Sequence, residues 1–141
     1  DRAREVGGFD TALPIAEDLD FYFRVCTNRA YARINQPLVY IHKVQGSLSH
    51  TQPGYRLNLE VISRLEKNHP EFARRHGEAF AQQRLAIYRS WISKCIIRGR
   101  GREARGLLRE SSRYGRVSGQ TALYLKSLIC PVVARIRNTN A

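Results

Sequence analysis

Apolar residues recur at helical spacing through most of the chain. In the first of these stripes, Leu19, Phe23 and Cys26 fall on one face at steps of four and three residues. Stripes of this kind, each of which predicts an amphipathic helix, occupy residues 16–27, 57–65, 71–97, 103–114 and 120–137. Pro131 lies within the last stripe and is expected to kink or interrupt that helix. The chain is therefore predicted to be mostly helical.

A shorter part of the chain has an extended pattern. Residues 30–35 and 38–42 are rich in Tyr, Ile and Val and are separated by a Gln-Pro pair, so they predict two short strands. Residues 44–52 combine a glycine with three hydroxyl side chains and predict a loop. The expected fold class is α/β, mixed but mostly α. In this interpretation residues 1–52 contain the strands and residues 53–141 form a helical extension.

Charge separates the same two regions. Residues 1–50 hold six basic and six acidic side chains, whereas residues 51–141 hold eighteen basic and six acidic ones, so the net charge of +12 lies in the second region. A basic region can meet an anionic membrane surface, a phosphorylated acceptor or nucleic acid. It can also be the solvated outer face of ordinary helices. The charge alone leaves these interpretations open.

Two details of the basic region favour one of these partners over another. Residues 123–137 combine apolar side chains with Arg135 and Arg137, which suits a helix that lies on anionic lipid. Nucleic acid is the less favoured partner, because Tyr114 and Tyr124 offer few aromatic platforms for bases and no binding motif is recognised. An anionic membrane surface is therefore the partner expected if this region binds one.

The composition also limits the class of protein. The longest apolar run, residues 128–134, has seven residues and contains a proline, whereas a transmembrane helix needs about 20 apolar residues. The three cysteines are odd in number and have no close pair, which favours a reducing compartment. No secretory signal is recognised. We therefore expect a cytoplasmic location, with peripheral contact at the inner membrane face.

The most informative segment runs from residue 6 to residue 20. Gly7 and Gly8 predict a turn that continues into Phe9 and Asp10, because adjacent glycines reach backbone angles closed to other residues. After a short spacer, three acidic residues open the predicted helix: Glu17, Asp18 and Asp20. The positive end of the helix dipole stabilises each of them by about 0.3 to 1 kcal/mol. Taken alone, such acids are frequent at a helix start.

The order of these features resembles the C-terminal part of the catalytic domain of family 2 glycosyltransferases, which have the GT-A fold. In that family a Gly-Gly-Phe-Asp turn precedes a Glu-Asp pair, a helix with an arginine, two short strands and a loop with spaced serines. The chain has the same order in residues 7–10, Glu17, Asp18, Arg24, residues 37–40 and residues 46–49. The resemblance implies that residues 1–52 are the acceptor-side end of a GT-A nucleotide-diphospho-sugar transferase domain.

The activity implied by this resemblance is inverting transfer of a sugar, as in polysaccharide biosynthesis. The donor would be a nucleotide-sugar and the acceptor a hydroxyl of a carbohydrate or lipid-linked molecule. The general base carried over by position is Asp18, whose carboxylate can take the hydroxyl proton from about 2.6 to 3.2 Å away. Acceptor-binding or site-shaping roles fall to Gly8, Asp10, Glu17, Arg24 and Ser47. Arg24 is expected to pair with a carboxylate.

The resemblance also implies Mg or Mn on the donor diphosphate. Asp18 and Asp20 do not suit this site, because they are about 200° apart on a helix and the family's Asp-x-Asp lies far upstream. The family often has a histidine just before the spaced serines. Here Val44 holds that place and His42 stands two residues earlier, so His42 is the candidate metal ligand. A lone histidine in a strand is also an ordinary packed or surface residue, and that interpretation stays open.

The nucleotide-binding half that family 2 enzymes carry before this segment does not precede Asp1, so the chain resembles a fragment. We expect the fragment alone to be inactive, to bind no cofactor and to give no heat with a nucleotide-sugar in calorimetry. The alternative is a non-catalytic basic helical module that binds an anionic membrane surface or nucleic acid. Asp18 in a concave polar site beside Ser47 would favour the transferase. An Asp18 carboxylate in bulk water would favour the binding module.

Overall fold

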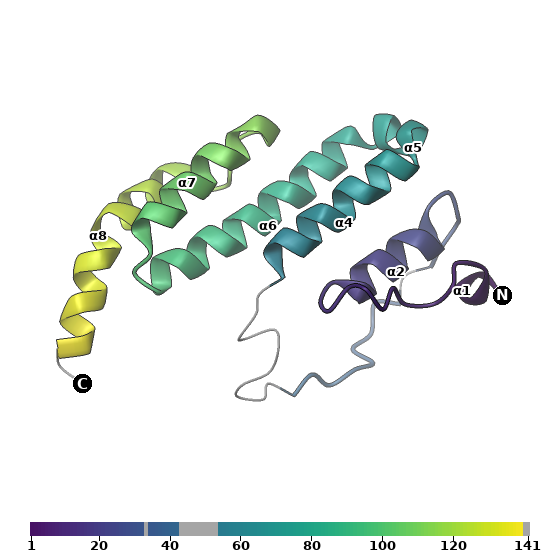
Figure 1. Ribbon diagram of the computed structural model, residues 1–141, viewed down its shortest axis with the longest axis horizontal. Helices are drawn as coiled ribbons and strands as arrows, with labels where there is room; N and C mark the ends of the chain where they lie inside the picture. Colours follow the sequence, from purple (N-terminus) through teal and green to yellow (C-terminus); the bar gives the residue numbers. More distant parts are fainter. Residues whose placement is uncertain (33, 43–53, 140–141) are drawn as a thin grey trace. The chain divides into compact units, whose positions relative to one another are not determined.

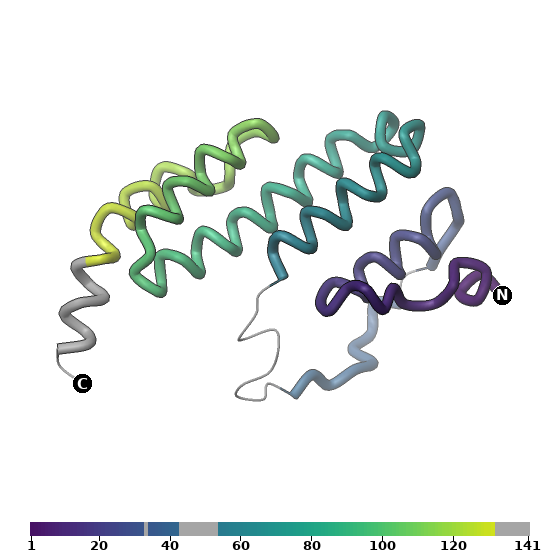
Figure 2. Tube along the Cα trace, in the orientation of Figure 1, coloured from purple at the N-terminus to yellow at the C-terminus, as the bar shows by residue number. Residues whose placement is uncertain are grey.

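The computed structural model describes residues 1–32, 34–42 and 54–139, with side chains through Pro131. Its helices are α1 (Arg2–Glu5), α2 (Glu17–Cys26), α4 (Tyr55–Asn68), α5 (Pro70–Arg75), α6 (Gly77–Ile97), α7 (Gly101–Ser111), the 3-10 turn η1 (Ser112–Tyr114) and α8 (Gln120–Thr139) (Figure 1). The chain divides into a first compact unit, Asp1–Arg75, and a second, His76–Ala141, which can be followed along the trace in Figure 2.

The prediction of a mostly helical chain is confirmed, whereas the strands of the expected α/β fold are not found in the described residues. Residues 30–32 and 34–42 have no strand partner there. A strand is stabilised by hydrogen bonds to a neighbouring strand, so β-branched and aromatic residues alone do not form one. These side chains are instead exposed, with Tyr40 at 94% of its full accessible surface.

The core of the first unit lies between α2 and α4. Leu13, Ala16 and Val61 are buried together, and three partly buried side chains pack against them: Leu19, Phe23 and Leu57. The predicted apolar faces of residues 16–27 and 57–65 are thus the faces that meet. Because α4 packs on α2, the boundary between the compact units follows Arg75, whereas the sequence interpretation placed a boundary near residue 52.

The second unit is built from α6, α7 and α8, which pack against one another. The predicted helix over residues 71–97 is divided at His76 into α5 and α6, next to Gly77, a residue that weakens helices. Within α6, Tyr88 is 2% exposed and its hydroxyl donates to Glu110 Oε1 at 2.8 Å. Burial, together with this hydrogen bond, raises the pKa of Tyr88 to about 12.

The sequence predicts neither a transmembrane helix nor a disulfide framework, and both expectations can be compared with the described residues. None of the helices there is both long enough and apolar enough to cross a bilayer. Cys26, Cys95 and Cys130 are all free thiols. Burial raises the pKa of the Cys95 thiol to about 11, so this cysteine stays protonated at neutral pH and is a poor nucleophile.

The sequence predicts that Pro131 kinks or interrupts the last helix. It does not interrupt α8, because other groups bond to the carbonyl that loses its helical donor. Proline has no N–H, so the Ser127 carbonyl four residues earlier loses its helical donor. Arg105 Nη1 of α7 donates to this carbonyl at 2.9 Å, and Cys130 Sγ lies 3.6 Å from it. The helix continues to Thr139, and the free carbonyl also connects α8 to α7.

Gly101 permits the close approach of α7 and α8 at the same point. A Cβ atom placed on Gly101 would lie 2.0 Å from the Ser127 carbonyl oxygen and 3.1 Å from Cys130 Sγ. The first of these atoms belongs to the backbone and cannot rotate away. Any larger residue at position 101 must therefore push the two helices apart.

We expect Gly101→Ala to lower the free energy of unfolding of the second unit by about 1 to 3 kcal/mol, the usual cost of overpacking. Gly106→Ala is the matched control in the same helix, because a Cβ there meets nothing within 4 Å. It should raise helix stability by up to about 1 kcal/mol. Urea unfolding followed by Trp91 fluorescence measures both. Equal midpoints for the two variants would contradict the close approach of the helices.

Candidate functional site

Two glycines with left-handed backbone angles form the turn that precedes α2. Gly7 has φ of +78° and Gly8 has φ of +69°, and a Cβ on either would meet nothing within 4 Å. Glycine is therefore needed here for its backbone angles and not for space. Asp10 closes the turn, since its Oδ1 accepts from the Ala12 N–H at 2.9 Å and its carbonyl accepts from the Leu13 N–H at 3.1 Å.

Arg24 joins this turn to α2. Its Nε donates to Asp20 Oδ2 at 2.7 Å, its Nη2 donates to the Gly8 carbonyl at 2.8 Å, and its Nη1 donates to the Val6 carbonyl. The expectation that Arg24 pairs with a carboxylate is confirmed, and the partner is Asp20. Arg2 Nη2 in turn donates to the Arg24 carbonyl at 3.2 Å. The turn and the helix of the motif are therefore one folded piece.

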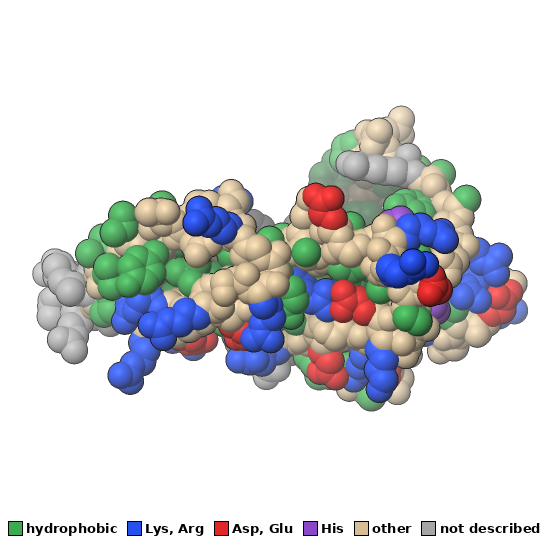
Figure 3. All heavy atoms as spheres, turned by 90° about the horizontal axis from the view of Figure 1, so that it is seen from above, with side chains coloured by type: hydrophobic (Ala, Val, Ile, Leu, Met, Phe, Trp, Pro, Cys, Tyr) green, Lys and Arg blue, Asp and Glu red, His purple; other side chains and the backbone are tan. Residues whose placement is uncertain are grey.

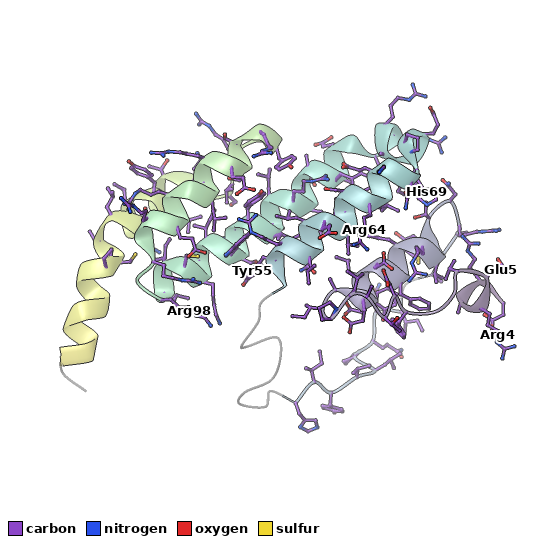
Figure 4. The ribbon with its side chains drawn as sticks, in the orientation of Figure 1. Arg4, Glu5, Tyr55, Arg64, His69 and Arg98 are labelled. Carbon is purple, nitrogen blue, oxygen red and sulfur yellow. The ribbon has the colours of Figure 1, made fainter. Side chains whose placement is uncertain are left out.

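A second ion pair connects the motif to α4. Arg64, labelled in Figure 4, has Nη1 3.4 Å from Asp10 Oδ2 and Nη2 2.8 Å from Glu60 Oε1. The hydrogen bond that Arg64 donates to Glu60, reinforced by the charges of Glu60 and Asp10, raises the pKa of Arg64. The pair with Asp10 spans 54 positions in the sequence. Asp10 is thus held by its own turn on one side and by α4 on the other.

These contacts surround a pocket of about 320 Å³ within the first unit. Its walls are the Gly-Gly-Phe-Asp turn, one face of α2 and the second half of α4, ending at His69 (Figure 4). Its charged lining comes from Asp10, Asp20, Arg24 and Arg64. At the rim, Phe9 is more than half exposed and its ring lies 4.6 Å from that of Phe21. An aromatic rim with paired charges can contact a polar ligand that has an apolar face.

Asp18 lies outside this pocket. It is exposed in the first turn of α2, where its Oδ1 accepts from the Leu19 N–H at 2.7 Å. Asp20 and Arg24 line the pocket, and a helical residue two positions before Asp20 points about 200° away from it. Glu17 is half-buried beside Asp18. The candidate base and the pocket therefore occupy different faces of α2.

Of the two remaining predicted site residues, only His42 lies in the described part of the chain, and it does not line the pocket. His42 is exposed, and Ser47 lies outside the described residues. Among the described residues, no group of three or more His, Cys, Asp or Glu side chains is placed to hold a metal ion. The Mg or Mn implied by the resemblance thus has no set of ligands within that part of the chain.

Sequence reasoning missed the contribution of α4 to the site. Arg64 and His69 line the pocket, although both fell in the region interpreted as a helical extension. Arg64 lies one turn from Val61 and Glu60, so its place on the helix follows from the period. The period does not show which element packs against Arg64. A signal that could have found the contact is the difference in charge, because residues 1–20 hold six acidic and two basic side chains, whereas residues 51–141 are basic.

The chain was also compared with known proteins. No protein-family model, curated protein or solved structure matches it.

Proposed function

We propose that this chain is the acceptor-side part of an inverting glycosyltransferase. The proposal rests on the order of motifs that resembles family 2 glycosyltransferases and on one contact in the structure. Arg24 holds the turn at Gly8 and, through Asp20, the helix that begins with Glu17 and Asp18. The two parts of the motif that are separate in sequence therefore act as one support. A fixed support is what a general base requires, because its distance to the acceptor hydroxyl controls the rate.

In the proposed reaction Asp18 removes the proton from the acceptor hydroxyl. The hydroxyl oxygen forms a bond to the anomeric carbon as the bond from that carbon to the diphosphate breaks. The nucleoside diphosphate leaves with the electron pair of the broken bond, and the proton remains on the Asp18 carboxylate. The place of Asp18 in the first turn of α2 keeps its carboxylate near the positive end of the helix dipole.

A second candidate function is binding of an anionic surface without chemistry. The observation that favours it is that the Asp18 carboxylate is exposed and lies outside the pocket of the first unit. The net charge of +12 points in the same direction, since such a charge attracts anionic partners. In this case Asp18 is an ordinary first-turn acid and its replacement has no effect on binding.

The experiment that separates the two candidates uses the complete protein that contains this chain, with all coding sequence that flanks it. The protein is incubated with a panel of nucleotide-sugars and a mixture of polysaccharide and lipid-linked acceptors. Release of nucleoside diphosphate is then measured. We expect release from one donor, increased by an acceptor. A folded protein that consumes none of the donors would contradict the transferase and support the binding module.

A further inference from the structure

The solvent-facing side of α8 is apolar, which is unusual for a surface helix. Leu125, Leu128 and Ile129 are spaced so that they share one face, and they are 58%, 48% and 59% exposed. Ser127 and Cys130 are buried on the opposite face. A surface helix of a folded domain normally has polar residues toward water. We call the three side chains, with the neighbouring Tyr124, the apolar face of α8.

The second unit that carries this face is strongly basic. From His76 onward the sequence has thirteen Lys and Arg residues and three Glu residues, a difference of +10, and no acidic residue follows Glu110. All three acids are already engaged, and Glu78 accepts from Gln82 Nε2 at 3.2 Å. Glu103 pairs with Arg100 at 3.0 Å, and Glu110 accepts from the Tyr88 hydroxyl. The positive charge of this unit is therefore not compensated within it.

Basic residues also lie next to the apolar face itself. Lys126 is exposed and follows Leu125 directly, so it stands about 60° around the helix from Ile129. In Figure 3, apolar (green) and basic (blue) side chains lie next to each other on the surface of the second unit. A helix with exposed Leu and Ile side chains bordered by cations is typical of segments that lie in the plane of a membrane interface.

We propose that the apolar face of α8 docks the protein on an anionic phospholipid bilayer. Leu125, Leu128 and Ile129 enter the boundary between headgroups and acyl chains, and the cations of the second unit stay at the level of the lipid phosphates. Both contributions are needed, because the apolar side chains alone form a small patch and the charges alone bind only loosely. This proposal does not rest on the glycosyltransferase proposal, since it concerns a different unit and a different ligand. It rests on the second candidate function, binding of an anionic surface, and names the residues and the lipid for it.

Two other partners fit this face less well. A second copy of the chain would bring two units of charge +10 together, and like charges at short distance oppose such a dimer. Nucleic acid would match the charge, but bases stack on aromatic rings and this face offers only one, Tyr124, beside three aliphatic side chains. An anionic bilayer matches both the apolar side chains and the positive charge.

The test is sedimentation of the full chain with vesicles of phosphatidylcholine alone or with about one-third phosphatidylglycerol. We expect binding to the anionic vesicles that weakens as salt is added, and much weaker binding to the neutral ones. The double variant Leu125→Ser, Ile129→Ser should lose about tenfold or more in affinity for the anionic vesicles. Lys126→Glu should weaken binding as well and reduce its dependence on salt.

The matched control is the double variant Val39→Ser, Ile41→Ser, which removes two apolar side chains of even greater exposure from the first unit. It should bind as the unchanged chain does. Equal binding by the Leu125, Ile129 double variant would overturn the proposal. So would a dimer without vesicles that dissociates in that variant, or binding of an oligonucleotide by a chain that ignores both kinds of vesicle. Circular dichroism of each variant shows whether its helices are intact.

Discussion

Asp18→Asn is expected to slow sugar transfer by the complete protein by about 10²- to 10⁴-fold, the range for loss of a general base. The amide has nearly the same shape as the carboxylate but cannot accept the acceptor's proton. The variant's free energy of unfolding should fall by no more than about 1 kcal/mol, because Asp18 is exposed and the charge is stabilised only by the end of the helix dipole.

Two further variants test whether the loss of rate is specific to the carboxylate at position 18. Asp18→Glu keeps a carboxylate and should recover part of the rate. Glu71→Gln removes an acid whose ion pair with Arg74 is exposed on both sides, at 79% and 81%, and should leave the rate unchanged. Transfer at the original rate by Asp18→Asn would remove Asp18 from the mechanism. A rate lost equally in Asp18→Asn and Glu71→Gln would indicate a general effect of charge.

Arg24→Met is expected to destabilise the first unit by about 2 to 4 kcal/mol. Breaking a buried ion pair by removing one partner costs about 3 to 5 kcal/mol, and the pair with Asp20 is partly accessible to water, at 29% and 13%, which lowers this figure. The variant also removes the donors to the Val6 and Gly8 carbonyls. Amide hydrogen exchange in α2 is the suitable measurement, because Trp91 reports on the second unit.

A double replacement distinguishes the ion pair from general packing. Asp20→Leu combined with Arg24→Met removes both charges, so no buried carboxylate is left without a partner, and part of the stability should return. Arg74→Met is the control for loss of an exposed arginine and should cost less than about 1 kcal/mol. If Arg24→Met and Arg74→Met had the same small effect, Arg24 would not be the support of the turn.

Local features of this chain were predictable from the sequence because they depend on neighbouring residues. The stripes of apolar residues correspond to α2, α4, α6, α7 and α8, since the hydrogen bonds of a helix join residues four apart. The pairing of Arg24 with a carboxylate was also predictable, because Asp20 stands one turn before it on the same helix.

Two further local features could not be predicted from neighbouring residues alone. Residues 38–42 have the composition of a strand, yet the described residues contain no strand beside them. Of the kink or interruption expected at Pro131, the interruption is not found, because Arg105 supplies a donor to the Ser127 carbonyl from another helix and α8 continues to Thr139. In both cases the outcome depended on a group distant in sequence.

The sequence by itself thus determined which residues form helices and which face of each helix is apolar, because the helical period acts over a few residues. Only the tertiary structure decided that Arg64 meets Asp10, that Gly101 touches the Ser127 carbonyl and that the apolar face of α8 lies toward water. The physical reason is that packing selects one arrangement of the helices from many. Asp10 and Arg64 are 54 positions apart, and no periodic pattern in the sequence predicts a contact over that separation.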